Sequence, residues 1–183
     1  ASVPGSIDLV ITSYNSIPYE TEINVIAPEG SYMLLDDFSI SNNDEAVNFS
    51  DQVSLSVMIE NVGTETSGFI TTTLINQTDN ATVLSPSITI DSVLANQMLE
   101  AGPFEFEVSS NVTNQENVEF KLLIEENESS WEYPISLTAN APEYNMLSSS
   151  IFDGENGSLD PGENVSVQMV IENTGSAALH YPT

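Results

Sequence analysis

Two nearly matching stretches decide the fold of this chain: Val53-Ser54-Leu55-Ser56-Val57-Met58-Ile59-Glu60-Asn61-Val62-Gly63-Thr64 and Val165-Ser166-Val167-Gln168-Met169-Val170-Ile171-Glu172-Asn173-Thr174-Gly175-Ser176. Both place an apolar residue at every second position, which is the period of a β-strand with one buried face. Both then end in Glu-Asn-x-Gly, where Asn and Gly tolerate the backbone angles of a turn. The chain therefore contains the same sandwich strand twice, and neither copy by itself names a chemical activity.

The composition bounds the class of protein and its partners. The 183 residues are 40% hydrophobic, which is enough for a packed core, and they suit one large domain or two small ones. There are 28 Asp and Glu against 1 Lys or Arg, a formal net charge of −27. Nucleic acid and anionic membrane surfaces are excluded as partners because both require clustered basic side chains. Divalent cations, by contrast, are attracted.

The chain has no cysteine, so it has no disulfide, thiolate zinc site or cysteine nucleophile. No apolar run approaches the roughly 20 residues of a membrane helix, and we expect no membrane insertion. The chain opens at Ala1-Ser2 without a basic, apolar leader. We therefore expect a processed or excised piece of a longer protein.

We predict an all-β fold: an immunoglobulin-like antiparallel β-sandwich in a tandem repeat with incomplete terminal units. Residues 1–31 carry the C-terminal strands of a preceding Ig-like domain. Residues 32–141 form one complete sandwich, because about seven short strands in some 100 residues is the count of such a domain. Its strands are expected at 33–40 with a kink at Asp36-Asp37, 53–60, 68–75, 88–90, 104–108, 118–124 and 131–137, the last two as a hairpin.

Residues 142–183 are interpreted as the first strands of a truncated second repeat. Asn61 and Asn173 are 112 residues apart (173 − 61), which suits one sandwich domain per repeat. Only eight residues follow Gly175. The outer edge of the second copy is therefore expected to be unpaired in an isolated chain.

An acidic, Gly-rich stretch from Asp153 to Glu163 is the best candidate for a site. Hard oxygen donors in a loop that folds around an ion are what Ca²⁺ requires, and the side chains expected to bind it are those of Asp153, Asn156, Asp160 and Glu163. The alternative is an acidic turn whose side chains bond backbone groups. The equivalent loop of the first copy, with Asn48 and Asp51, lacks the glycines and is interpreted as a turn.

No catalytic residue is predicted. The only histidine, His180, lies three residues from the end with no evident nucleophile beside it. Trp131, Tyr133 and Tyr144 are candidates for a sugar-stacking platform. The strand-alternating spacing of Trp131 and Tyr133 favours a place in the core.

The stretch Asp153–Glu163, running into Val165–Gly175, resembles the opening of repeat modules in bacterial surface and secreted proteins. Ile7–Tyr14, Asn15–Tyr19 and Ile23–Gly30 are similar to the end of the Ig-like domain that follows the catalytic domain in gingipain-type cysteine peptidases. In that family the catalytic Cys and His lie upstream. The resemblance therefore implies a non-catalytic piece of a larger secreted protease, and no catalytic residue carries over to this chain.

From these observations we expect a non-catalytic module, extracellular or at the cell surface, that spaces, stabilises or anchors a gingipain-like peptidase. Its expected partners are the catalytic domain of the same polypeptide and neighbouring Ig-like repeats. Two alternatives stay open: a carbohydrate-binding or adhesive β-sandwich, which needs an exposed aromatic row, and an enzyme, which needs a pocket of convergent perturbed acids.

Overall fold

A computed structural model describes residues 4–42, 46–152, 161–162 and 164–178 of the chain. Over these residues the secondary structure is entirely β-strand and turn, so the predicted all-β class is confirmed. No helix of this part of the chain is long and apolar enough to cross a membrane. The strands are β1 (Gly5–Ile11), β2 (Tyr19–Val25), β3 (Met33–Ser41), β4 (Val47–Asn48), β5 (Gln52–Asn61), β6 (Ile70–Asn76), β7 (Ala81–Val83), β8 (Ser87–Ile90), β9 (Met98–Val108), β10 (Glu116–Glu126), β11 (Ser129–Asn140), β12 (Tyr144–Phe152) and β13 (Ser166–Asn173).

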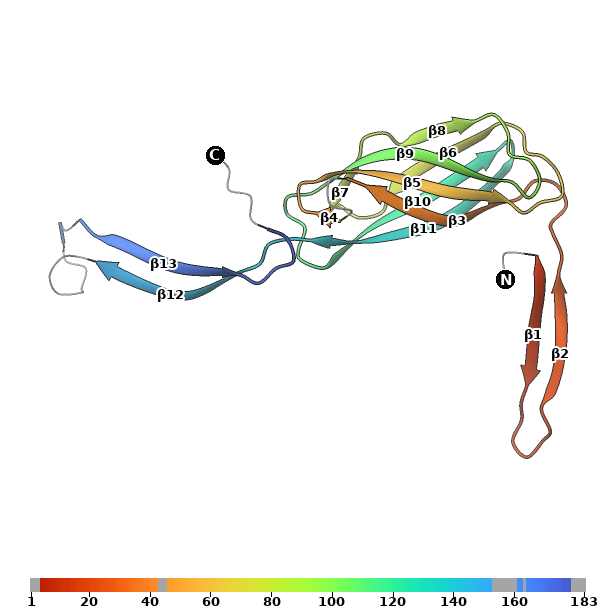
Figure 1. Cartoon of the computed structure of the whole chain (residues 1–183), viewed down its shortest axis with the longest axis horizontal. Coiled ribbons are helices and arrows are strands. Elements are labelled where there is room, and N and C mark those ends of the chain that lie inside the picture. Colours follow the sequence, from red (N-terminus) through yellow and green to blue (C-terminus); the bar gives the residue numbers. More distant parts are fainter. Residues whose placement is uncertain (1–3, 43–45, 153–160, 163, 179–183) are drawn as a thin grey trace.

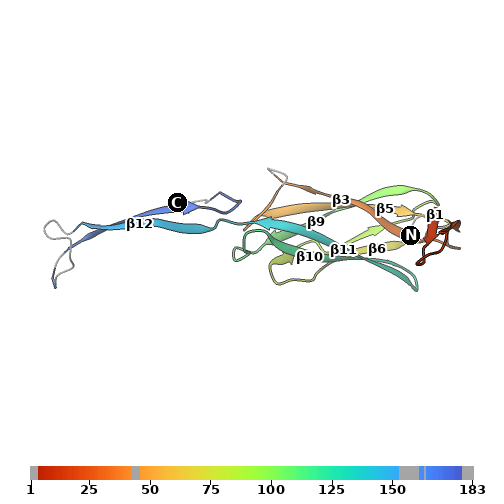
Figure 2. The same ribbon diagram turned by 90° about the horizontal axis from the view of Figure 1, so that it is seen from below.

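Strands β3 to β11 form a central sandwich of two sheets (Figures 1 and 2). One sheet has the order β3-β5-β9-β7 and the other the order β4-β11-β10-β6-β8. All neighbouring strands are antiparallel except the short β4, which runs parallel to β11. Strands β3 to β10 alternate between the two sheets along the chain, and β11 pairs with β10 in the second sheet. The apolar side chains of both sheets form one common core.

The core is built from the alternating apolar residues that the sequence displays. Val53, Leu55, Val57 and Ile59 of β5 are each 0% exposed, while the residues between them are partly exposed. The rings of Phe106 on β9 and Phe120 on β10 lie 4.8 Å apart and join the two sheets, and burying a side chain of this size contributes about 1.5–3 kcal/mol.

The sequence predicted most of these strands but missed two of them and the first half of a third. The hairpin of β10 and β11 is confirmed, and the kink at Asp36-Asp37 is a register shift between Leu35 and Asp37. The short strands β4 and β7 were missed. Strand β9 begins at Met98, six residues before the predicted strand 104–108. Its first part was not predicted because Gly102 interrupts the alternation. There the backbones of β9 and β5 approach so closely that a Cβ on Gly102 would lie 2.9 Å from Ser56 Cα.

Two antiparallel hairpins, β1–β2 and β12–β13, extend from opposite ends of the sandwich (Figure 1). Every residue of β12 and β13 is exposed. Among the described residues β12 is the one strand paired with β13, whose second edge carries no neighbour.

The β12–β13 hairpin repeats the register of β3–β5. Tyr144 pairs with Asn173 as Met33 pairs with Asn61. A register shift follows at the same place in each hairpin, between Met146 and Ser148 in one and between Leu35 and Asp37 in the other. Because register and bulges are specified features of a strand pair, the two hairpins are the same structural element.

The β1–β2 hairpin is a regular antiparallel pair that runs from Gly5↔Val25 to Ile11↔Tyr19, with residues 12–18 connecting the two strands. The β10–β11 hairpin is connected by residues 127–128 alone, because Glu126 pairs with Ser129. Of the two terminal hairpins, β12–β13 is therefore the one whose register matches a strand pair of the sandwich.

Candidate functional site

The described residues offer one feature that occurs twice and joins separate parts of the chain: the Asn-x-Gly sequence at the ends of β5 and β13. We call the first the N-terminal joint, formed by Asn61 and Gly63 with residues 28–32. The second is the C-terminal joint, formed by Asn173 and Gly175 with residues 141–143.

At the N-terminal joint, Asn61 is 0% exposed and uses all four of its hydrogen-bonding positions. Its Oδ1 accepts bonds from the backbone N–H groups of Tyr32 and Gly63, both at 3.0 Å. Its Nδ2 donates to the carbonyl oxygens of Glu65 at 2.8 Å and Val93 at 3.0 Å. One side chain therefore ties the linker before β3, the turn after β5 and the loop before β9.

Gly63 lets the linker lie directly against this turn. A Cβ at this position would lie 2.2 Å from Gly30 O and 2.7 Å from Tyr32 N, both backbone atoms. Glu65 N donates to Gly30 O at 3.1 Å, and Val62 N donates to Tyr32 O at 2.9 Å. The linker is fastened along its backbone, with no room for a side chain at Gly63.

The C-terminal joint repeats this geometry. Asn173 Oδ1 accepts bonds from Glu143 N at 3.1 Å and Gly175 N at 3.0 Å, and its Nδ2 donates to Ala177 O at 2.8 Å. Thr174 N donates to Glu143 O at 2.7 Å, as Val62 N does to Tyr32 O. A Cβ on Gly175 would lie 2.2 Å from Ala141 O.

The two joints differ by one hydrogen bond. Asn61 also donates to Val93 O, in the loop that leads from β8 to β9. Among the described residues Asn173 has no counterpart of this bond. The bond that distinguishes Asn61 is therefore made to the loop before β9, which belongs to the sandwich itself.

Each joint is also fixed to the end of the sandwich that it adjoins. The carboxylate of Glu126, at the end of β10, accepts a bond from Gly68 N at 2.5 Å and another from Ser31 Oγ. At the other end Asn114 Oδ1 accepts bonds from Ala141 N at 3.2 Å and Ser176 N at 3.1 Å. Each hairpin is therefore held to the sandwich by hydrogen bonds as well as by its covalent linker.

The aromatic residues beside the N-terminal joint belong to the core, as the spacing favoured. Trp131 and Tyr133 pack against it, and the Trp131 ring lies edge-on to Tyr32 at 5.7 Å. Tyr133 Oη donates to Met33 O at 2.6 Å. Burial, and secondarily the neighbouring Tyr32, raises the pKa of Tyr133 to about 12. Tyr144 is exposed on β12, so these residues do not form one stacking platform.

The predicted calcium ligands Asp153, Asn156, Asp160 and Glu163 all lie outside the described residues, as does His180. In the first copy, Asp51 Oδ2 accepts bonds from Asn48 N at 3.3 Å and Asn48 Nδ2 at 3.0 Å, which is the behaviour of a turn residue. In the ranges that the structure describes, no three His, Asp or Glu side chains are grouped to bind a metal ion.

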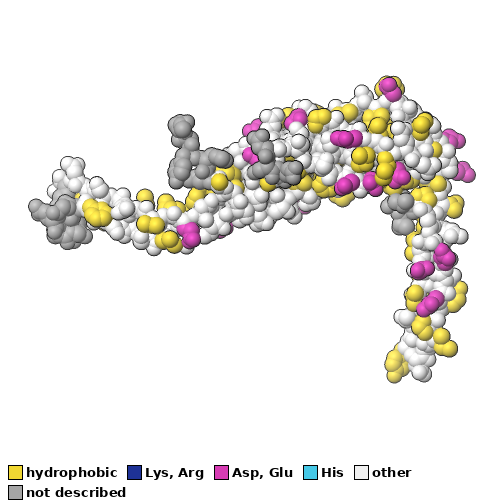
Figure 3. Space-filling model, in the orientation of Figure 1, with side chains coloured by type: hydrophobic (Ala, Val, Ile, Leu, Met, Phe, Trp, Pro, Cys, Tyr) yellow, Lys and Arg dark blue, Asp and Glu magenta, His cyan; other side chains and the backbone are white. Residues whose placement is uncertain are grey.

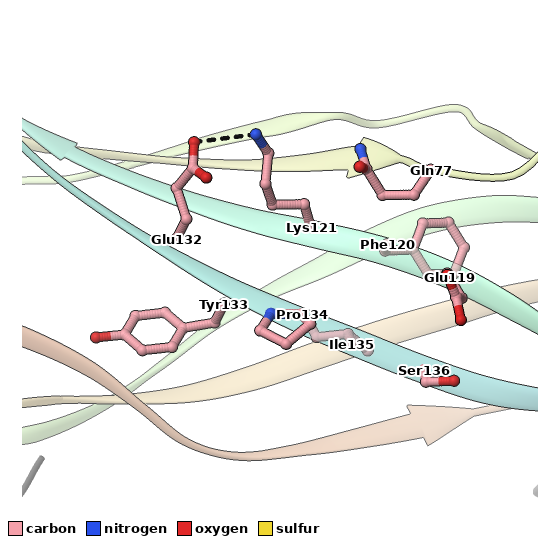
Figure 4. Close-up of a pocket in the computed structure, with 9 residues that line it drawn as sticks. All are labelled: Gln77, Glu119, Phe120, Lys121, Glu132, Tyr133, Pro134, Ile135 and Ser136. Carbon is pink, nitrogen blue, oxygen red and sulfur yellow. Dashed lines mark hydrogen bonds and ion pairs between the residues drawn. The ribbon is translucent and has the colours of Figure 1, made fainter. Parts of the chain in front are cut away.

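A pocket of about 380 Å³ lies on the outer face of β6, β10 and β11 (Figure 4). Lys121 Nζ lies 2.9 Å from Glu132 Oε1 at its rim, and both side chains are solvent-accessible. The two residues form an exposed cross-strand ion pair, which contributes little to stability. The pocket is lined by Gln77, Glu119, Phe120, Lys121, Glu132, Tyr133, Pro134, Ile135 and Ser136. Ser136 lies opposite Glu119 in the register of β10 and β11, and the set contains no histidine. The side chain of Phe120 is buried, and Tyr133 packs against the core.

Sequence reasoning identified the repeated Asn-x-Gly but interpreted it only as a turn. It missed Asn114, Glu126 and Val93, since their positions depend on contacts between residues distant in the sequence. The available signal was the repetition itself, because a turn alone does not require Asn at the same place in both copies.

No protein-family model matches the chain, and no curated protein sequence matches it either.

Proposed function

We propose that this chain is a non-catalytic, extracellular spacer built from Ig-like β-sandwich units joined end to end, and that it spaces, stabilises or anchors a secreted gingipain-like cysteine peptidase. In this proposal β1–β2 ends one unit, β3 to β11 form a second, and β12–β13 open a third. The observation that carries it is the geometry of the two joints, which is the same before and after the sandwich.

The strand order supports the Ig-like assignment. An Ig sandwich places its first, second, fifth and fourth strands in one sheet, and its third, sixth and seventh in the other. The order β3-β5-β9-β7 fits the first sheet, and the adjacent β6, β10 and β11 fit the second. The short strands β4 and β8 lie at the two edges of the second sheet and are additional to that arrangement.

The joints support a mechanical role. A flexible linker behaves as a coil, whereas these linkers are bonded through backbone groups on both sides of the sandwich. Side-chain oxygens of Glu126 and Asn114 add bonds to the sandwich itself. Units connected in this way keep a fixed direction from one to the next, which is the property that a spacer requires.

The assignment to a gingipain-like peptidase depends on the resemblance of residues 7–30 to the Ig-like domain of that family. The absence of cysteine is consistent with a non-catalytic part, since the nucleophile of such a peptidase is a cysteine. We further propose that Ca²⁺ binds Asp153, Asn156, Asp160 and Glu163 and stiffens the loop between β12 and β13.

Reading the coding sequence upstream of the codon for Ala1 tests the peptidase assignment directly. A catalytic domain with a Cys and His pair is the expected finding, and an unrelated upstream domain refutes it. In a protein with that domain, removal of residues 32–141 is expected to leave turnover of a small peptide substrate unchanged while lowering its thermal stability or its retention at the cell surface. Loss of turnover itself would contradict a spacer role.

A further inference from the structure

The sequence carries seven Asn-x-Ser/Thr triplets, the acceptor sequence for N-linked glycans in secreted proteins. An acceptor must present both the amide nitrogen of its Asn and the hydroxyl two residues later, since the glycan-transferring enzyme binds both. Two of the triplets lie between β12 and β13 in the sequence, and the other five lie in the sandwich, where the structure distinguishes them. The five asparagines are Asn48, Asn76, Asn80, Asn111 and Asn127.

Three of the five asparagines use the amide nitrogen inside the fold. Asn48 Nδ2 donates to the carboxylate of its own turn at 3.0 Å. Asn76 Nδ2 donates to Ala81 O at 2.6 Å, at the start of β7. Asn80 Nδ2 donates to Asn117 O at 3.1 Å and so bonds the turn before β7 to β10. A glycan on any of these nitrogens would replace a hydrogen bond that holds a turn of the sandwich.

Asn111 is exposed, but the hydroxyl of its triplet is already bonded. Thr113 Oγ1 donates to Glu116 Oε2 at 2.7 Å, and Thr113 N donates to the same oxygen at 2.8 Å. Val112, between the Asn and the Thr, is 5% exposed and packs in the core. This triplet is therefore fixed in one conformation, with its hydroxyl occupied.

Asn127 is the one asparagine of the five that meets both requirements. It lies in the two-residue turn of the β10–β11 hairpin, which Glu126 and Ser129 close as a pair. Asn127 and Ser129 are exposed, and among the described residues neither Asn127 Nδ2 nor Ser129 Oγ has a hydrogen-bond partner. The φ of Asn127 is 51°, in the left-handed region that Asn tolerates in a turn. The hairpin tip thus presents the triplet to a second molecule without the opening of any strand.

The surroundings of Asn127 are polar, which suits a hydrated sugar. Glu128 beside it is exposed, and Figure 3 shows acidic side chains at this end of the sandwich, from which β1–β2 extends. Asn127 also follows Glu126, whose carboxylate accepts bonds from Gly68 N and Ser31 Oγ. A group attached to Asn127 therefore lies beside the N-terminal joint and displaces none of its bonds.

We propose that Asn127 carries an N-linked glycan and that it is the one sandwich triplet modified in the folded protein. The inference rests on the extracellular location in the proposed function. The donor is an oligosaccharide bonded through its C1 carbon to the phosphate of a polyprenyl carrier. The bond between C1 and the phosphate oxygen breaks as the bond between C1 and Asn127 Nδ2 forms. The phosphate leaves with the electron pair, and Nδ2 loses one proton.

Glycopeptide mass spectrometry of the secreted protein, purified from the cells that make it, tests the site. Chymotrypsin is the suitable protease, because the chain has one Lys or Arg and cleavage after Leu123 and Trp131 separates Asn127 from every other triplet. We expect peptide 124–131 to carry a glycan and the peptide with Asn76 and Asn80 to be unmodified. An unmodified Asn127, or a glycan on Asn76 or Asn80, overturns the proposal.

Substitutions in the triplet separate an N-linked glycan from any other change at this turn. Asn127→Gln and Ser129→Ala are each expected to abolish the modification, whereas Ser129→Thr keeps the hydroxyl and retains it. Asn111→Gln is the matched control, since Asn111 is an exposed loop residue and its loss leaves the glycan on Asn127 in place. A modification that persists in Ser129→Ala overturns the proposal. Circular dichroism of each variant checks that the sandwich stays folded.

Transfer in vitro tests whether the fold selects the site. The unmodified 183-residue chain is incubated with a purified oligosaccharyltransferase and its lipid-linked donor, beside synthetic peptides of residues 74–84 and 123–131. Both peptides are expected to accept glycan, whereas the folded chain accepts it at Asn127 and at neither Asn76 nor Asn80. Transfer to Asn76 or Asn80 of the folded chain, or none to Asn127, overturns the proposal. Neither result affects the spacer role, which the upstream coding sequence and the deletion experiment test separately.

Discussion

Replacing Asn61 by Ala removes the side chain on which the N-terminal joint depends. The substitution deletes four hydrogen bonds from a residue that is 0% exposed. Val93 O keeps the bond that it accepts from Ser67 N at 3.0 Å, so this carbonyl stays satisfied. The other three bonds contribute about 1 kcal/mol each, which gives an expected loss of about 3 kcal/mol in the free energy of unfolding. For a domain of this size that corresponds to a fall in Tm of about 10–20 °C.

Urea unfolding followed by tryptophan fluorescence measures this change directly. The chain has one tryptophan, Trp131, whose ring lies against that of Tyr32. The backbone N–H of Tyr32 donates a hydrogen bond to Asn61 Oδ1, so the fluorophore is close to the substituted side chain. Asn173→Ala is the matched control, because it deletes the same side chain from the exposed joint, where water replaces the lost bonds. It is expected to change sandwich unfolding by less than about 0.5 kcal/mol. A loss below about 1 kcal/mol for Asn61→Ala, or an equal loss for both variants, would refute the reasoning.

Three further predictions follow from the same structure. Gly63→Ala is expected to destabilise the sandwich because its Cβ would lie 2.2 Å from Gly30 O, whereas Gly68→Ala, with its nearest atom at 3.4 Å, is the tolerated control; equal denaturation midpoints would contradict this. The stability associated with Tyr133 is fully present below pH 10 and is lost as pH rises through about 12, since the unfolded phenol ionises first; Tyr133→Phe should flatten the alkaline fall in denaturation midpoint, and an unchanged slope would count against it. Calcium is expected to raise the Tm of the chain relative to a chelator, and Asp160→Asn should reduce the shift; identical melts with and without calcium would remove the Ca²⁺ proposal.

The sequence was sufficient for the strands that have strong alternation and insufficient where pairing is decided by distant residues. Val53–Ile59 and Val118–Ile124 were predicted because each places one apolar face toward a core. Strand β7 has only three residues, and its place beside β9 depends on the partner strand rather than on its own pattern. The first part of β9 was not predicted for a related reason. Gly102 and Pro103 interrupt the apolar alternation at the point where the backbones of β9 and β5 lie close together.

The joints show the same division between local and distant information. The sequence located both Asn-x-Gly turns, but their function depends on linker atoms that lie 29 or 30 residues away in the chain. Nothing in the local pattern distinguishes an Asn that bonds its own turn from one that also binds a preceding linker. The period of 112 residues was the stronger clue, because it places the same residue at the same point of two structurally equivalent hairpins.

Within the described ranges the side chains of the two joint asparagines bond only to backbone groups, and this determines what a joint requires of the linker that it binds. Tyr32 donates its N–H at one joint and Glu143 at the other, although an aromatic ring and a carboxylate have little in common. The joint therefore constrains the path and length of the linker and leaves its side chains unspecified. A linker of different sequence can therefore occupy either joint as long as the Asn and Gly are kept.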